Sequence, residues 1–213
     1  MVGVRKNALT AKQCLDIINT AELTGFKLAG LRDNSGDSYY DENYRKSSVS
    51  FIKQDNLSID VWNAIYTTIL SLNEEYYNAK LTNFDMQLAW YQAGELGFEW
   101  HRDDPPYPTE TQIWSGRKLT YVFELSNESD YEGGYLAVDP DNNRDEQKNI
   151  LNLNSHTPQS NIFRIPATYT QSNPKRTQGD CVVFPSFFNH KVYPITSGNR
   201  YSLTVWAKGP LWV

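Results

Sequence analysis

The sequence predicts a mainly β protein of the α+β class, in which an antiparallel sandwich or barrel carries helices on one outer face. Three observations predict this fold. Two stretches within the first 80 residues have apolar residues that recur with the period of a helix. From residue 84 onward the period changes to two, as in strands with one face in a core. Gly, Pro, Asn and Asp then divide the chain into several short apolar runs.

Length and composition point to one folded domain, 1–213, because 213 residues can bury a single sizeable core. The net charge of −5 disfavours binding to nucleic acid. The first residues lack the apolar core of a signal peptide, and no apolar run approaches the roughly 20 residues that cross a bilayer. We therefore expect a cytoplasmic protein with no membrane partner.

Two helices are expected in a supporting region of about 10–80. Thr10 can cap the first helix, Gln13 completes a capping box, and Gly25 ends the helix. The apolar residues Leu15, Ile18 and Ala21 recur in it at helical spacing. The second helix is expected from about Leu57 to Tyr77. Its core-facing residues are Val61, Ile65, Ile69 and Leu72.

The region of about 84–208 is expected to form the β core. Alternate residues from Phe84 to Trp90 are apolar and can share one face of a strand. Later strand-like runs cover 118–125, 134–138, 181–185, 190–195 and 200–208. Two polar stretches, 32–48 and 139–160, are expected to be long loops.

Two histidines and an aspartate suggest a metal site. In an extended strand, His101 and Asp103 present an imidazole and a carboxylate on the same face. A single such pair is more often an ordinary hydrogen-bonded pair, so the interpretation depends on His190, which opens a later strand. Two histidines and one carboxylate on one side of a metal form the facial triad of non-haem Fe(II) oxygenases. The third histidine, His156, lies in a polar stretch and is expected to be solvated.

An arginine opens the strand that follows His190. Antiparallel pairing of the two strands would bring Arg200 and His190 to one wall of the core. An unpaired guanidinium is costly to bury, so Arg200 needs an anionic partner. The carboxylate of a ligand would provide one.

Six segments between about Phe84 and Trp206 resemble the Fe(II)- and 2-oxoglutarate-dependent dioxygenases, within them the prolyl 4-hydroxylase-like branch. They occur in the family's order and read WYQAGELGFEWHRDD, RKLTYVFEL, YEGGYLAV, GDCVVFP, NHKVYPI and GNRYSLTVW. The resemblance implies a double-stranded β-helix, a distorted cupin-like jelly roll, with the N-terminal helices packed on one sheet. This architecture agrees with the strand pattern described above.

The resemblance also implies roles for individual residues. It makes His101, Asp103 and His190 the catalytic iron ligands, and it assigns the distal carboxylate of 2-oxoglutarate to Arg200 and Tyr91. Further residues placed beside the co-substrate or the iron are Thr204, Leu136 and Trp206.

Glu124 departs from the family pattern, because some prolyl hydroxylases of this branch have a tyrosine there. A carboxylate would repel an anionic co-substrate, so we expect Glu124 to turn away or another group to line that corner.

The implied reaction hydroxylates an unactivated C–H bond with O2 and releases succinate and CO2. Its cofactors are Fe(II) and 2-oxoglutarate, with ascorbate as an optional reductant. A prolyl residue in a protein or peptide is the preferred substrate, because YRKSSVSFI, 44–52, resembles a substrate-covering segment of the family. The segment 104–115 would form a second rim. Tyrosines that can stack on a proline ring are Tyr39, Tyr40, Tyr44 and Tyr107.

Other readings of the same residues stay open. Relatives of this fold also hydroxylate lysyl residues, free amino acids or small metabolites. Members that repair nucleic acid usually carry a second arginine near the oxoglutarate, and no arginine follows Arg200. A binding module that kept the jelly roll and lost the chemistry is a further alternative.

Overall fold

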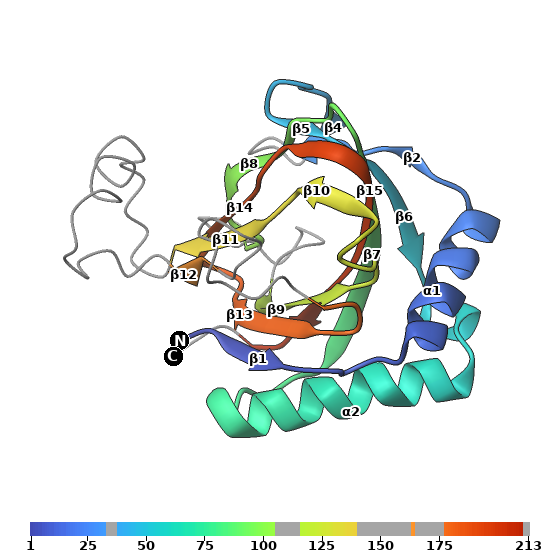
Figure 1. Cartoon of the computed structure of the whole chain (residues 1–213). Coiled ribbons are helices and arrows are strands. Elements are labelled where there is room, and N and C mark those ends of the chain that lie inside the picture. Colours follow the sequence, from blue (N-terminus) through green and yellow to red (C-terminus); the bar gives the residue numbers. More distant parts are fainter. Residues whose placement is uncertain (33–37, 105–115, 140–162, 165–176, 211–213) are drawn as a thin grey trace, which may run out of the picture.

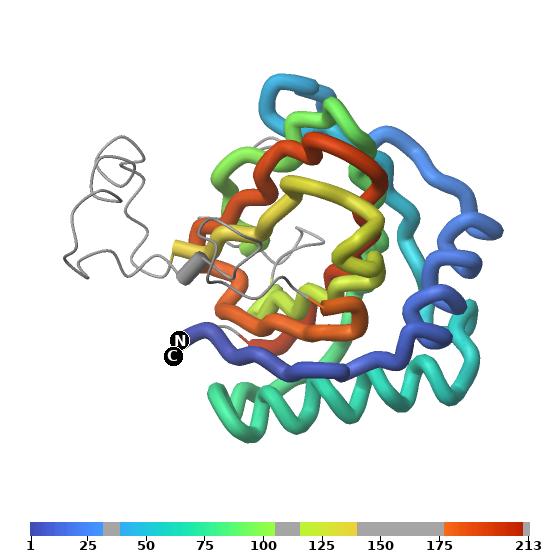
Figure 2. The backbone as a smooth tube through the Cα atoms, viewed as in Figure 1, coloured from blue at the N-terminus to red at the C-terminus, as the bar shows by residue number. Residues whose placement is uncertain are grey.

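Two facing β-sheets form the body of the protein, and two helices cover the outside of one of them (Figure 1). This computed structural model describes residues 1–32, 38–104, 116–139, 163–164 and 177–210. The backbone path in Figure 2 shows the strands winding around a common interior. The predicted mainly β jelly roll with N-terminal helices is therefore confirmed. None of the described helices is both long and apolar enough to cross a membrane.

The larger sheet has eight strands within the described residues. Their order is β1-β13-β9-β15-β7-β6-β2, with β10 beside β15. The bounds are β1 Gly3–Arg5, β2 Lys27–Leu28, β6 Ser48–Ile52, β7 Asn83–Gln92, β9 Arg117–Glu124, β10 Tyr131–Gly133, β13 Cys181–Pro185 and β15 Ile195–Lys208. All pairs are antiparallel, and the long strand β15 lies between β9 and β7.

The smaller sheet faces the larger one across the interior. Its order is β12-β11-β14-β8-β5, with bounds β12 Phe163–Arg164, β11 Leu136–Asp139, β14 Asn189–Val192, β8 Gly97–His101 and β5 Arg45–Lys46. A separate hairpin consists of β3 Leu31–Arg32 and β4 Ser38–Tyr39. Because β5 belongs to the smaller sheet and β6 to the larger, the chain passes from one sheet to the other at Ser47.

The two helices begin and end close to the predicted residues. Helix α1, Ala11–Thr24, has the capping box of Thr10 and Gln13 and ends at Gly25, whose φ of 93° favours glycine. Helix α2, Ile59–Tyr76, follows a short 3-10 helix, Gln54–Asn56. All four predicted core residues of α2 are buried.

Of the apolar residues that suggested α1, Ala21 is buried and Ile18 packs against the core, but Leu15 does not belong to the buried face. The buried residues of α1 are Cys14, Ile17 and Ala21, whereas Leu15 is 54% exposed. The apolar period of this helix is short and mixed, so several faces fit it almost equally well.

Two hydrophobic cores lie on the two sides of the larger sheet. The first fills the space between this sheet and the helices, and the second lies between the two sheets. Strand β7 contributes to both, since Met86 and Leu88 pack toward the helices while Ala89 and Tyr91 point into the sandwich. The prediction of a strand with only one face in a core is therefore corrected, because the face that was not expected to be covered, with Ala89 and Tyr91, points into the sandwich.

The stretch 32–48 is not a plain loop in its described part. It contains β4, β5 and the first residue of β6, but strands of two residues are too short to show a period. The other predicted loop, 139–160, lies outside the described residues except for Asp139, which ends β11. His156 and Tyr107 also lie outside them.

Candidate metal centre

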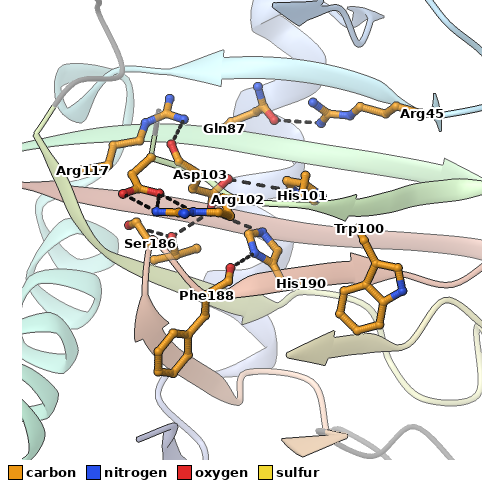
Figure 3. A network of polar contacts seen from close by, with 12 residues as sticks. Arg45, Gln87, Trp100, His101, Arg102, Asp103, Arg117, Ser186, Phe188 and His190 are labelled. Atoms are coloured by element: carbon orange, nitrogen blue, oxygen red, sulfur yellow. Dashed lines mark hydrogen bonds and ion pairs between the residues drawn. The ribbon is translucent and has the colours of Figure 1, made fainter. Parts of the chain in front are cut away.

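Strands β8 and β14 bring two histidines together. His101 ends β8 and is the Cα partner of His190 on β14. Asp103 follows β8, where its N–H donates to the Ser186 carbonyl at 2.9 Å. The Asp103 carboxylate lies 3.9 Å from His101 Nε2 and 3.4 Å from His190 Nε2 (Figure 3). One potential ligand atom from each residue lies within 4.8 Å of the others.

The hydrogen bonds of the two imidazoles determine which nitrogen faces the cluster. His101 Nδ1 lies 2.6 Å from the Glu99 carbonyl, and His190 Nδ1 lies 3.0 Å from the Phe188 carbonyl. A carbonyl oxygen can only accept, so each Nδ1 carries the proton and each Nε2 keeps its lone pair. Both lone pairs are thus available to a metal on the side of Asp103.

Asp103 is held as a carboxylate. Burial alone would raise its pKa, but His190, His101 and Arg117 outweigh burial and hold the pKa well below its usual range. The Thr120 hydroxyl donates to Asp103 Oδ2 at 2.7 Å and orients it. Burial, and then His190, lower the pKa of His101 well below its usual value, which favours the neutral, metal-binding imidazole.

These donors fit a ferrous ion. Two neutral imidazoles and one carboxylate on one side of a metal are the ligand set of non-haem Fe(II) sites, which leave other positions open. Within the described part of the chain, no other group of three or more such side chains lies close enough together to hold a metal.

A single cavity of about 1260 Å³ contains every predicted site residue. The residues that share this lining are His101, Asp103, His190, Tyr91, Leu136, Arg200, Thr204 and Trp206. The expected pairing of the strands that carry His190 and Arg200 is wrong, because β14 belongs to the smaller sheet and β15 to the larger. The two residues instead reach the same cavity from the two sheets. The roles of all these lining residues as metal and co-substrate ligands stay predictions.

Several residues of this site were missed from the sequence. Phe98 stacks on His101, with ring centroids 3.4 Å apart. The guanidinium carbon of Arg45 lies over the Phe98 ring, 4.3 Å from its centroid. Thr120 is the Cα partner of Trp206 and so faces the interior. Alternation along 118–125 could have placed Thr120 on an inner face, but not beside Asp103.

Arg200 has an anionic partner inside the protein. Its Nη2 and Nε donate to Glu124 Oε2 at 2.9 and 3.2 Å, and its Nη1 lies 3.4 Å from Ser202 Oγ. Arg200 is 1% exposed and Glu124 is 0% exposed. Burial alone would lower the pKa of Arg200, but Glu124 raises it above its usual value.

The expectation that a ligand supplies this partner is therefore corrected. Glu124 is the Cα partner of Ser202, which places its side chain on the same inner face as Arg200. Glu124 is not among the residues that line the cavity, whereas its ion-pair partner Arg200 is.

Comparison with known proteins defines the class. The family model described as the 2OG-Fe(II) oxygenase superfamily matches residues 86–208. The chain belongs to this superfamily, which implies Fe(II), 2-oxoglutarate and O2 as cofactors. It is 26% identical over 120 residues to a PKHD-type hydroxylase of Psychrobacter sp. (strain PRwf-1), a match that covers 55% of this chain and 35% of the relative. The chain thus spans about a third of the length of that curated relative.

Solved structures with the same fold include prolyl hydroxylases. A Pseudomonas putida prolyl-4-hydroxylase has a TM-score of 0.64 at 17% identity, covering 98% of this chain and 92% of that one. A Trichoplax adhaerens prolyl hydroxylase, solved with a hypoxia inducible factor peptide fragment, has a TM-score of 0.62 at 18% identity. The match covers 97% of this chain and 83% of that one. The viral collagen prolyl hydroxylase of Paramecium Bursaria Chlorella virus-1, solved as its 2OG complex, has a TM-score of 0.61 at 16% identity. The match covers 98% of this chain and 96% of that one. The expected resemblance to the prolyl hydroxylase-like branch is confirmed at the level of the fold.

Proposed function

We propose that this protein is a hydroxylase that uses Fe(II), 2-oxoglutarate and O2 to hydroxylate an unactivated C–H bond, with release of succinate and CO2. A prolyl residue in a protein or peptide is the proposed substrate. The observation that carries the proposal is the convergence of two Nε2 lone pairs and one carboxylate in a cavity large enough for further ligands. We propose that 1–213 forms one dioxygenase domain, with about 10–80 as its helical support.

The proposed roles follow from what each side chain touches. His101, Asp103 and His190 would hold the iron, and the carbonyls behind the two imidazoles would fix their orientation. Iron and 2-oxoglutarate would together activate O2 for the oxidation, while the protein would position them and the substrate. Leu136 and Trp206 would form apolar walls beside the iron.

The distal end of 2-oxoglutarate would lie deeper in the sandwich. Arg200, Tyr91 and Thr204 face the cavity from two adjacent strands, with Arg200 and Tyr91 as Cα partners. The Arg200 guanidinium carbon lies 5.7 Å from the centroid of the Tyr91 ring, so both groups can approach one carboxylate.

Aromatic side chains at the cavity support a peptide substrate. Tyr39, Tyr44 and Trp100 line it, and the Tyr44 hydroxyl donates to the Trp100 carbonyl at 2.6 Å. Tyr40 is 61% exposed and does not line the cavity. Flat aromatic faces suit a proline ring or an extended peptide. The Trichoplax relative was solved with a peptide fragment bound.

The test uses full-length protein loaded anaerobically with Fe(II). Metal content is measured first, then succinate formation from 2-oxoglutarate in air, with and without ascorbate. A library of proline-containing peptides is finally screened by mass for the gain of one oxygen atom. We expect one iron per chain, iron-dependent succinate and oxidation of a prolyl peptide.

Each other result has a defined meaning. A folded protein that makes no iron-dependent succinate would be a non-catalytic binding module. Oxidation of lysyl peptides, free amino acids or nucleobases, with no prolyl product, would replace the proposed substrate but keep the proposed chemistry.

A further inference from the structure

Besides Arg200, the cavity lining contains Arg45, Arg102 and Arg117, and Arg45 lies in the segment 44–52 that resembles a substrate-covering segment of the family. Arg45, on β5 of the smaller sheet, is half-buried and lines the same cavity as Arg200. It lies beside the candidate metal centre, since its guanidinium carbon is 4.3 Å from the Phe98 ring that stacks on His101. Figure 3 shows Arg45 reaching Gln87 next to the His101 and Asp103 side chains.

The partners of Arg45 are neutral. Its Nη2 donates to Gln87 Oε1 at 3.0 Å, and its Nε donates to Ser47 Oγ at 3.2 Å. No carboxylate of the described residues forms an ion pair with it. Burial lowers the pKa of Arg45, while Tyr91 and Asp103 favour its charged form. A cation in this setting gains from an anion that enters the cavity.

Arg45 also lies at the right level of the sandwich for a co-substrate. Along β15 and β7 the Cα partners are Trp206 with Asp85, Thr204 with Gln87, and Arg200 with Tyr91. Gln87, and the Arg45 side chain bonded to it, therefore lie between the iron end of β15 and Arg200. Tyr91, the Cα partner of Arg200, also favours the charged form of Arg45.

The charges of these groups show why a second arginine is needed. The charge of Glu124, 2.9 Å from Arg200 Nη2, cancels that of Arg200 at short range. A ligand carboxylate that reaches Arg200 is also repelled by Glu124. Arg200, Arg45 and Glu124 taken together retain one positive charge, which matches the single charge of a distal carboxylate.

We propose that Arg45 binds the distal carboxylate of the co-substrate together with Arg200, and supplies the positive charge that Glu124 cancels. This inference rests on the proposed function and names a 2-oxo acid with a second carboxylate as the ligand class. Arg45 is thereby a co-substrate-binding residue, and Glu124 a residue that weakens the affinity for this ligand.

The test measures binding of 2-oxoglutarate to full-length protein loaded with Fe(II) under anaerobic conditions, by calorimetry and by the absorption of the complex. Arg45→Met is expected to weaken binding roughly ten- to hundredfold, as for loss of a charge-assisted hydrogen bond. Glu124→Gln, which keeps the shape of the side chain, is expected to tighten binding. The double variant has the wild-type net charge and is expected to bind within about threefold of wild type.

Two controls separate a charge contact from general damage. Arg5→Met removes an arginine whose ion pair with Glu75 is exposed, and its affinity for 2-oxoglutarate should not change. The second control is 2-oxopentanoate, which has the same 2-oxo acid head and no distal carboxylate. Its affinity should be the same in wild type and Arg45→Met, a comparison that does not depend on Glu124 variants folding.

The outcomes are distinguishable. If metal-loaded wild type binds no 2-oxoglutarate, the proposed function fails. If wild type binds and folded Arg45→Met binds within about threefold of it, only the role of Arg45 fails. Equal weakening for 2-oxoglutarate and 2-oxopentanoate, or a double variant no tighter than Arg45→Met, would also overturn the charge argument.

Discussion

Replacing Glu124 by alanine is expected to lower the free energy of unfolding by about 3–5 kcal/mol, because it leaves a buried guanidinium without its charged partner. The setting is fully desolvated, since Arg200 is 1% and Glu124 0% exposed. One carboxylate oxygen accepts two hydrogen bonds from Arg200, at 2.9 and 3.2 Å. An exposed pair of the same charges would contribute only about 0–1 kcal/mol.

The assay is equilibrium denaturation of the metal-free protein. The matched control is Glu75→Ala, because the pair of Glu75 with Arg5 has a similar length of 3.2 Å but side chains that are 51% and 43% exposed. The double variant Glu124→Leu with Arg200→Met replaces both charges by apolar groups and is expected to recover most of the loss. A loss below about 1 kcal/mol in Glu124→Ala would refute the buried pair. So would a double variant no more stable than the single one.

Three further predictions concern the metal and the core, and the last is paired with a control at an exposed position. His190→Ala is expected to abolish stoichiometric Fe(II) binding, measured as metal content after gel filtration, while the far-ultraviolet spectrum stays unchanged. Thr120→Val removes the hydrogen bond to Asp103 and is expected to weaken metal affinity about 10–100-fold, measured by competition with a chelator; unchanged affinity would mean that Thr120 does not orient the carboxylate. Ile65→Ala is expected to cost about 2–5 kcal/mol of stability because Ile65 is fully buried. Leu15→Ala, at a position 54% exposed, is expected to change stability by no more than about 0.5 kcal/mol.

Local patterns predicted the elements whose ends and faces are encoded in neighbouring residues. The capping box of Thr10 and Gln13 and the glycine at 25 defined α1, and the stripe of α2 was correct at every position. The alternation from Phe84 onward predicted β7, although not that both of its faces are covered. The spacing of His101 and Asp103 on one strand end was also local, which is why two of the three candidate ligands could be paired from the sequence.

The remaining features depend on contacts between distant parts of the chain. Glu124 and Arg200 are 76 positions apart, and only the register of β9 against β15 makes them neighbours. Thr120 donates to Asp103 because the two sheets face each other. The apolar period of the sequence carries no information about how two sheets face each other. Strand β5 has two residues, so Arg45 read as part of a polar loop.

The chain passes from the smaller to the larger sheet at Ser47, so residues before the family match, as well as residues within it, line the cavity. The family match begins at residue 86, whereas Arg45 reaches the interior from a segment about forty residues upstream of that point. Strand β5 pairs with β8 at two residue pairs, and the Glu99 N–H also donates to the Tyr44 carbonyl at 2.8 Å, whereas the two candidate histidine ligands are paired between β8 and β14. Under the proposal that Arg45 binds the co-substrate, a change in this upstream segment would alter selectivity for the co-substrate and leave the three candidate iron ligands as they are.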